Sequence, residues 1–111
     1  MKKLCSIALI MLTFLTLTFT PPALAVETTD GAQIFAQNCA SCHANGGNII
    51  RRGKNLKKRA LKWHKKDSVE AISALVKRGK YAMPAYADRM KENQIEAVAA
   101  YVLQQAENNW Q

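Results

Sequence analysis

The sequence has few of the residues from which thiol and metal sites are built. Its 111 residues include only three cysteines and two histidines. Cys5 lies in an apolar N-terminal segment, so Cys39 and Cys42 are the pair left for the rest of the chain. A disulfide between residues so close in sequence would close a very small loop and stabilise little. Another chemistry is needed to explain this pair.

The sequence also lacks a second long apolar run after its N-terminus. Two lysines precede an apolar run over residues 4–19, and an Ala-Leu-Ala sequence ends at Ala25. A basic start, an apolar middle and a small-x-small end are typical of a secretory signal peptide. The run is shorter than the roughly 20 residues that span a bilayer. We therefore expect a cleaved signal peptide over residues 1–25 and a soluble, exported domain over residues 26–111, without stable membrane insertion.

Acidic residues are scarce, with eight against sixteen Lys and Arg and a formal net charge of +8. The excess is concentrated in residues 51–66, here called the basic segment, which hold nine basic residues and no acidic one. Such a field speeds encounter with acidic partners, although a solvated helix face would carry the same charge. Nucleic-acid binding also suits a basic run, but export argues against it, and Trp63 is the only aromatic residue among these charges. We therefore expect no nucleic-acid partner.

Helical periodicity, with no strand pattern, predicts a single small all-α domain. Thr29 or Asp30 can cap a first helix that carries the chain into the cysteine pair. The strongest pattern is the last, where apolar residues recur at spacings of three and four over residues 95–106.

Two shorter helices are predicted between these. Residues 55–64 indicate a short, very basic helix with Leu61 and Trp63 among its apolar contacts. Asp67 can cap a further helix, which Gly79 would end.

Residues 39–43 form a C-x-x-C-H motif, Cys39-Ala40-Ser41-Cys42-His43, which is the attachment signal of c-type haem. On one helical turn the two thiols and the imidazole share a face, so the thiols can add to two vinyl groups while the imidazole reaches the iron. The other ring nitrogen of His43 should then donate to a backbone carbonyl. We predict one covalent haem c, with Cys39 and Cys42 as thioether anchors and His43 as an axial ligand.

The second axial ligand must come from elsewhere, and Met83, Met90 and His64 are the candidates. Met83 is favoured because it precedes Pro84 in a loop, far enough along the chain from His43 to reach the opposite haem face. Met90 suits the core, and His64 lies among lysines as a surface residue would. Two filled axial positions disfavour oxygen and peroxide chemistry. We therefore expect one-electron transfer, not an enzyme.

Other roles for these residues are open at this point. A structural zinc site needs four ligands, and only His43 and His64 could join the two cysteines. A thioredoxin-like dithiol would need a βαβ setting, of which the sequence shows no sign. A haem protein that senses or binds a small ligand is the third alternative, and it would require Met83 to be displaceable.

From Gly31 to Trp110 the chain resembles cytochrome c6. The shared residues are 34–35, 39–43, 46–48, 54–56, 68–72, 79–86, 97–102 and Trp110. The resemblance implies about four helices around the haem, axial ligation by His43 and Met83, and residence in a thylakoid lumen or periplasm. It also implies electron carriage from the cytochrome b6f complex to photosystem I, and we expect a monomer that docks transiently through the basic segment. A c6-like carrier of lower potential, serving another acceptor such as a terminal oxidase, is the related alternative.

Three positions depart from the pattern usual in cytochrome c6. Arg52 replaces a proline close to the carbonyl thought to orient His43. Leu75 replaces a glutamine near the haem of photosynthetic members, and c6-like members with an aliphatic residue there are expected to have a lower potential. Lys91 replaces a capping serine, so we expect a frayed start to the last helix.

Overall fold

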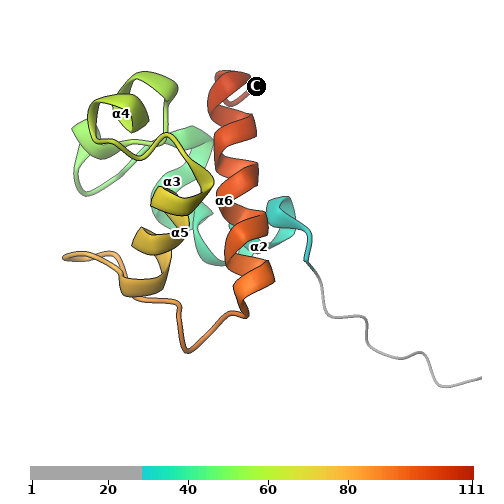
Figure 1. The fold of residues 1–111 in the computed structure, drawn as a ribbon. Helices are drawn as coiled ribbons and strands as arrows, with labels where there is room; N and C mark the ends of the chain where they lie inside the picture. Colours follow the sequence, from blue (N-terminus) through green and yellow to red (C-terminus); the bar gives the residue numbers. More distant parts are fainter. Residues whose placement is uncertain (1–28) are drawn as a thin grey trace, which may run out of the picture.

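The computed structural model describes residues 29–111, and this part of the chain is helical (Figure 1). Its elements are α2 (Gly31–Asn38), α3 (Ala40–His43), the 3-10 turns η1 (Ala44–Gly46) and η2 (Arg52–Lys54), α4 (Lys58–Trp63), α5 (Val69–Arg78) and α6 (Glu92–Glu107). No strand occurs between residues 29 and 111, where one isolated bridge joins Lys80 and Met83. The all-α prediction is confirmed, with the short helix α3 added at the C-x-x-C-H motif. The expected signal peptide, residues 1–25, lies outside the described residues.

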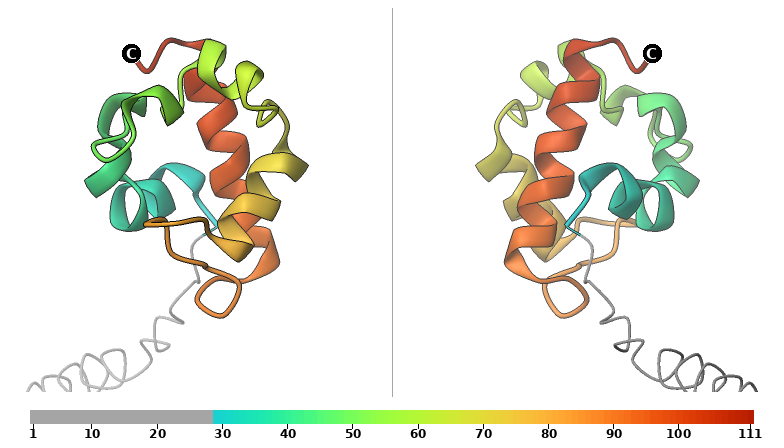
Figure 2. Two further views of the ribbon diagram at one scale, coloured as in Figure 1. Left: turned by 90° about the vertical axis from the view of Figure 1, so that its left-hand side faces the viewer. Right: turned by 90° about the vertical axis from the view of Figure 1, so that its right-hand side faces the viewer.

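Helix α6 is the centre of the domain, because α2 and α5 both pack along it (Figure 2). Its inward face buries Ile95, Val98, Ala99, Val102 and Ala106. Helix α2 adds Ile34 and Phe35 to this core, and α5 adds Ile72 and Val76. Gly31 permits the close approach of α2, since a Cβ there would lie 2.2 Å from the Ala97 carbonyl oxygen. None of the helices in residues 29–111 is long and apolar enough to cross a bilayer.

The helix starts follow the capping signals, with one shift. Asp30 caps α2, as predicted, by accepting a hydrogen bond from the N–H of Ala32 at 3.0 Å. The cap of α5 is Ser68 and not Asp67, because the Ser68 hydroxyl accepts from the N–H of Ala71 at 3.1 Å. Helix α5 ends, as predicted, at Gly79, whose φ of 66° lies in the left-handed region.

The predicted fraying of the last helix is not seen. The side-chain oxygen of Gln94 accepts a hydrogen bond from the N–H of Lys91 at 2.9 Å, which closes the start of α6 without a capping serine. Glu92 in the first turn pairs with Lys77 of α5 and lies at the favourable end of the helix dipole. These contacts replace the missing cap.

Helix α4 is shorter than predicted. The Asn55 side chain accepts from the N–H of Lys57 at 3.0 Å, and this local bond competes with helical pairing, so the helix begins only at Lys58. Leu61 is 4% exposed and packs on the core, as expected. Trp63 is 83% exposed, so the prediction that it packs inward is wrong.

Candidate haem-binding site

The C-x-x-C-H motif begins where α2 ends. Cys39 donates its N–H to the Phe35 carbonyl at 2.8 Å, while its own carbonyl accepts from the N–H groups of Cys42 and His43 at 3.1 and 2.9 Å. The first helix leads into the cysteine pair, as predicted, and it is interrupted at Cys39, whose φ of −117° departs from the helical value. The break makes the motif a separate helical turn, and this turn contains both thiols and the imidazole.

The His43 ring is held by a backbone carbonyl, as predicted. Its Nδ1 lies 2.8 Å from the Gly47 carbonyl oxygen. Since a carbonyl can only accept, Nδ1 carries the hydrogen and Nε2 has its lone pair available. Such a bond fixes the ring orientation and raises the basicity of the ligating nitrogen, so His43 fits an axial haem ligand.

Asn48, the residue after Gly47, organises the loop that supplies this carbonyl. Its side-chain oxygen accepts from the N–H groups two and three residues further on, at 3.0 and 2.7 Å, and its amide group donates to the Lys54 carbonyl at 2.9 Å. Arg52 is exposed at the start of η2. The Asn48 side chain thus closes the loop that follows the Gly47 carbonyl, with Arg52 exposed within it.

Trp110 packs against the same loop and bonds to the residue that follows it. Gly46 has a φ of 72°, and a Cβ on it would lie 2.4 Å from the Trp110 indole. The indole Nε1 donates to the Leu56 carbonyl at 3.0 Å, and the N–H of Leu56 donates to the Gly46 carbonyl at 2.7 Å. The Phe35 and Trp110 rings lie 5.2 Å apart. The C-terminus thus fastens the loop after His43 to the core, a contact that the local sequence does not reveal.

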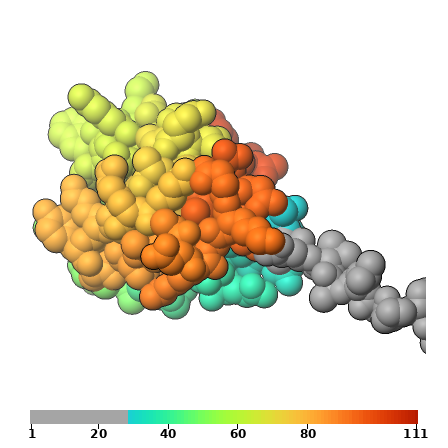
Figure 3. All heavy atoms as spheres, turned by 60° about the horizontal axis from the view of Figure 1, so that its bottom comes forward, coloured from blue at the N-terminus to red at the C-terminus, as the bar shows by residue number. Residues whose placement is uncertain are grey.

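Met83 lies in the loop of residues 79–91, which joins α5 to α6 and occupies the lower left of the surface in Figure 3. Lys80 and Met83 exchange two backbone hydrogen bonds of 3.0 Å, so the chain turns tightly before Met83. Gly79 has no room for a side chain, because a Cβ there would lie 2.6 Å from the Met83 carbonyl oxygen. The Met83 side chain is half-buried and packs against the core.

Two tyrosines join this loop to the His43 side of the molecule. The Tyr86 hydroxyl donates to the Asn38 carbonyl at 3.0 Å, directly before Cys39. At the tip of the loop, the Tyr81 ring lies 5.1 Å from the Arg51 guanidinium. Figure 2 shows the loop reaching from α5 towards α2 and α3. These two contacts join the loop that contains Met83 to the segments on either side of His43, so the chain between the two residues is closed into a ring. Sequence analysis did not predict either tyrosine contact.

The other candidate ligands are placed as predicted. Met90 packs against the core. His64 lies at the end of α4, where its Nε2 approaches the Gly53 carbonyl oxygen at 3.2 Å. Neither residue belongs to the loop contacts that join the two sides of the site.

The cysteines fit haem attachment better than the alternatives. Cys39 and Cys42 are half-buried free thiols. Burial raises the pKa of the Cys39 thiol from 9.0 to about 11, whereas reactive dithiols depend on a lowered thiol pKa. In residues 29–111 no group of three or more His, Cys, Asp or Glu side chains is arranged to hold a metal ion. Two thiols and an oriented imidazole in one helical turn suit a porphyrin.

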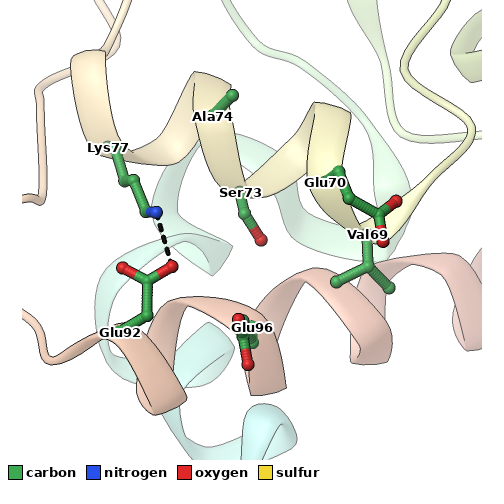
Figure 4. A pocket seen from close by; sticks show the side chains of 7 residues that line it. All are labelled: Val69, Glu70, Ser73, Ala74, Lys77, Glu92 and Glu96. Atoms are coloured by element: carbon green, nitrogen blue, oxygen red, sulfur yellow. Dashed lines mark hydrogen bonds and ion pairs between the residues drawn. The ribbon is translucent and has the colours of Figure 1, made fainter.

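A separate groove of about 250 Å³ lies between α5 and α6, away from these residues (Figure 4). Glu70, Glu92 and Glu96 line it, and Glu92 pairs with Lys77 across it. The Ser73 hydroxyl points towards α6 and is buried without a hydrogen-bond partner. The groove is thus lined by acidic side chains, whereas the basic segment has none.

Comparison with known proteins agrees with this geometry. A profile of the family described as "Cytochrome C oxidase, cbb3-type, subunit III" matches residues 26–102. A cytochrome c6-like protein of a Nostoc strain is 54% identical over 110 residues, which cover 99% of each chain. Cytochrome c6 of the same strain is 49% identical with the same coverage.

Solved structures give the same answer. Crystalline cytochrome c6C from a Synechococcus strain superposes with a TM-score of 0.69 at 58% identity, over 70% of this chain and 95% of that chain. Crystalline cytochrome c6B from another Synechococcus strain gives a TM-score of 0.71 at 47% identity, over 77% and 97% of the two chains. The chain therefore belongs to the cytochrome c6 family, binds one covalent haem c and acts as an electron carrier.

Proposed function

We propose that this protein carries single electrons from the cytochrome b6f complex to photosystem I in a thylakoid lumen, and that it catalyses no reaction of its own. In this proposal Cys39 and Cys42 form the two haem thioethers, and His43 and Met83 are the axial ligands. When bound, the haem iron stores one electron by alternating between its ferric and ferrous states.

The hydrogen bond from His43 Nδ1 to the Gly47 carbonyl is the observation that carries the proposal, because it leaves Nε2 available for iron. The Lys80–Met83 turn and the Tyr86 bond to Asn38 support Met83 as the second ligand. A neutral thioether stabilises ferrous iron and raises the potential. Two side-chain ligands, His43 and Met83, would leave the iron no free position for a substrate.

The direction of transport and the compartment rest on the family and on the N-terminal sequence. The curated relatives named cytochrome c6 include proteins of several cyanobacteria. Residues 1–25 have the order of charge, apolar run and small residues that directs export. A monomer that is released into the lumen can move between two membrane complexes.

A second candidate is a carrier of lower potential that serves another acceptor, such as a terminal oxidase. Leu75 favours it, because an aliphatic side chain on α5 replaces the usual polar group near the haem and is half-buried. The 54% identity to a protein named cytochrome c6-like points in the same direction.

A reductive titration of the haem-loaded protein, followed by flash-induced oxidation with photosystem I particles, tests the proposal. We expect a low-spin spectrum, a potential between those of the two membrane complexes, and oxidation that saturates with protein concentration. A potential below that of the cytochrome b6f donor would contradict the proposed route and support the second candidate. Rapid binding of carbon monoxide to the ferrous protein would instead support a ligand-sensing role.

A further inference from the structure

The groove between α5 and α6 contains a buried hydroxyl group that has no partner. Ser73 is 5% exposed, and its Oγ forms no hydrogen bond with any residue from 29 to 111. Figure 4 shows this hydroxyl pointing from α5 across the groove to α6, where Glu96 lies. Buried polar groups in folded proteins are nearly always hydrogen-bonded, to protein, water or a ligand. The Ser73 hydroxyl therefore indicates that the groove receives a hydrogen-bonding group.

The carboxylates around this hydroxyl outnumber the cations. Three of the eight acidic residues of the chain line the groove, Glu70, Glu92 and Glu96, against one cation, that of Lys77. Lys77 pairs with Glu92. Between residues 29 and 111, Glu70 and Glu96 take part in no ion pair. In a chain that is basic as a whole, the groove is thus a local site that favours a cation.

The cation that fits is an ammonium group and not a metal ion. In the described part of the chain no three carboxylate, imidazole or thiol groups are arranged to hold a metal. An ammonium group donates up to three hydrogen bonds, so it can bind the Glu96 carboxylate and the Ser73 hydroxyl together. Lys77 already shows this chemistry, because its ammonium group binds Glu92 while its half-buried side chain lines the groove.

The groove is elongated in a way that suits a chain with an ammonium group at each end. Glu70 and Glu92 lie at opposite ends in Figure 4, with Ser73 between them. Glu70 and Ser73 are three residues apart on α5, or about 4.5 Å along the helix axis, which a short diamine can span. Val69 and Ala74 add apolar contacts that suit methylene groups.

The groove is separate from the haem site. None of the four proposed haem-binding residues lines it. Leu75, which is proposed to lie near the haem, is two residues from both Ser73 and Lys77 on α5. Two residues correspond to a rotation of about 200°, so Leu75 lies on the opposite face of this helix. Binding of haem therefore leaves the groove accessible.

We propose that the groove between α5 and α6 binds a short linear aliphatic diamine. One ammonium group binds Glu96 and the Ser73 hydroxyl, the other binds Glu70, and the methylene chain lies along Val69 and Ala74. This inference goes beyond electron transport and does not depend on the identity of the redox partners. A lysine side chain of a second copy offers the same ammonium chemistry, so one arm of the test separates the two sources.

Three variants of the haem-loaded protein test the site. Glu96→Gln removes a carboxylate from the groove, and Ser73→Ala removes the hydroxyl. Glu107→Gln is the matched control, because it removes the same charge from an exposed position of α6 outside the groove. Thermal unfolding of each variant shows that the fold is unchanged. Loss of an unpartnered buried hydroxyl should not destabilise the protein, so a change in affinity in Ser73→Ala reports on the ligand.

The first arm is an NMR titration of the reduced, haem-loaded protein with 1,4-diaminobutane. We expect saturable shifts of the amide signals of Ser73, Ala74 and Glu96. The affinity should fall about tenfold in Glu96→Gln and about threefold in Ser73→Ala, and stay unchanged in Glu107→Gln. Absence of saturable shifts would overturn the proposal, and so would equal affinities in Glu96→Gln and the control.

The second arm separates binding from screening of the carboxylates. At matched ionic strength, tetramethylammonium chloride has the same charge without N–H groups, and magnesium chloride has a compact double charge. Neither should reproduce the shifts that the diamine causes, and 1,4-butanediol, which has no charge, should cause none. Equal shifts with magnesium or tetramethylammonium would show an acidic surface without a binding site and would overturn the proposal.

The third arm measures sedimentation at low salt to detect a second copy in the groove. We expect the unaltered protein and Glu96→Gln to sediment alike, with no effect of 1,4-diaminobutane. Self-association of the unaltered protein that is lost in Glu96→Gln and kept in Glu107→Gln would assign the groove to a lysine of another copy and overturn the small-molecule site.

Discussion

The two sides of the haem site are built in different ways. On the His43 side, a four-residue helix and a loop are connected by hydrogen bonds between residues close in sequence, such as His43 to Gly47. On the Met83 side, the loop of residues 79–91 has no helix and depends on distant contacts, such as the Tyr86 hydroxyl bond to Asn38. The bond that orients His43 forms within one short segment, although Trp110 also fastens its loop to the core, whereas the Met83 side depends more on contacts between distant segments.

This difference predicts which side of the haem site loses its structure first when the domain is destabilised. In the proposed site, covalent attachment through Cys39 and Cys42 would keep the haem on the motif, so that His43 would stay beside the iron when packing weakens. Met83 has no such constraint, and its position depends on Gly79, Lys80 and Tyr86. Perturbation of the domain should therefore release the Met83 side first.

Replacing the proposed ligand should have the largest effect. In Met83→Ala the iron loses its thioether, and we expect the midpoint potential to fall by on the order of 100 mV. The opened position should also bind carbon monoxide. Met90→Leu, at a methionine packed on the core, is the matched control and should retain the original potential. Equal potentials in the two variants would remove Met83 from the site.

Gly79→Ala should have an effect almost as large as Met83→Ala, because the added methyl group disturbs the backbone beside Met83. Gly79→Ala combines a φ of 66° with a Cβ only 2.6 Å from the Met83 carbonyl oxygen, so we expect a loss of about 2 kcal/mol or more in the free energy of unfolding. Methionine ligation should weaken as well. Gly53→Ala is the control, since nothing lies within 4 Å of the place its methyl group would take and its φ is not in the left-handed region. The two variants are compared by denaturant unfolding. Equal losses in the free energy of unfolding would contradict a special role for Gly79.

Loss of the Tyr86 hydroxyl should have a smaller effect. Tyr86→Phe removes the bond to Asn38 and should lower the free energy of unfolding by about 1 kcal/mol. Burial raises the pKa of Tyr86 above its ordinary value of 10.0, so the folded state favours the neutral phenol. Its contribution is present below pH 10 and is lost as the pH rises through the folded-state pKa. The phenylalanine variant should therefore lose less stability in alkali, and an unchanged alkaline profile would argue against this role.

Leu75→Gln should give the smallest of these effects. In the proposed site Leu75 lies near the haem, so a polar group at this half-buried position of α5 would change the electrostatics there without altering either proposed ligand. We expect the potential to rise by roughly a few tens of millivolts, with an unchanged visible spectrum. Ala74→Gln, at an exposed neighbouring position, is the control in the same redox titration. A rise shared by both variants would show that Leu75 does not tune the iron.

The sequence predicted best what depends on neighbouring residues. The carbonyl bond of His43 is such a case, because the residue that supplies it lies four positions away. The helical turn of the motif and the caps at Asp30 and Gly79 are others. In each of these the geometry follows from a few consecutive side chains and the backbone between them.

Distant contacts could not be predicted in this way. The Tyr86 bond to Asn38 spans 48 residues, and the Trp110 bond to Leu56 spans 54. Trp63 was misplaced because α4 has six residues, too few for apolar spacing to define its inward face. The exposed position of Trp63 follows from the packing of α4 on η2 and α6 through Leu61.

The methyl resonances of methionine test the central claim most directly. With ¹³C-methyl methionine in the reduced, haem-loaded protein, the methyl group of a methionine whose sulfur binds the iron lies in the ring current of the porphyrin and resonates far upfield. We predict one such signal, absent in Met83→Ala and retained in Met90→Leu. An upfield methyl signal that persists in Met83→Ala, or no upfield signal in the unaltered protein, would contradict ligation by Met83.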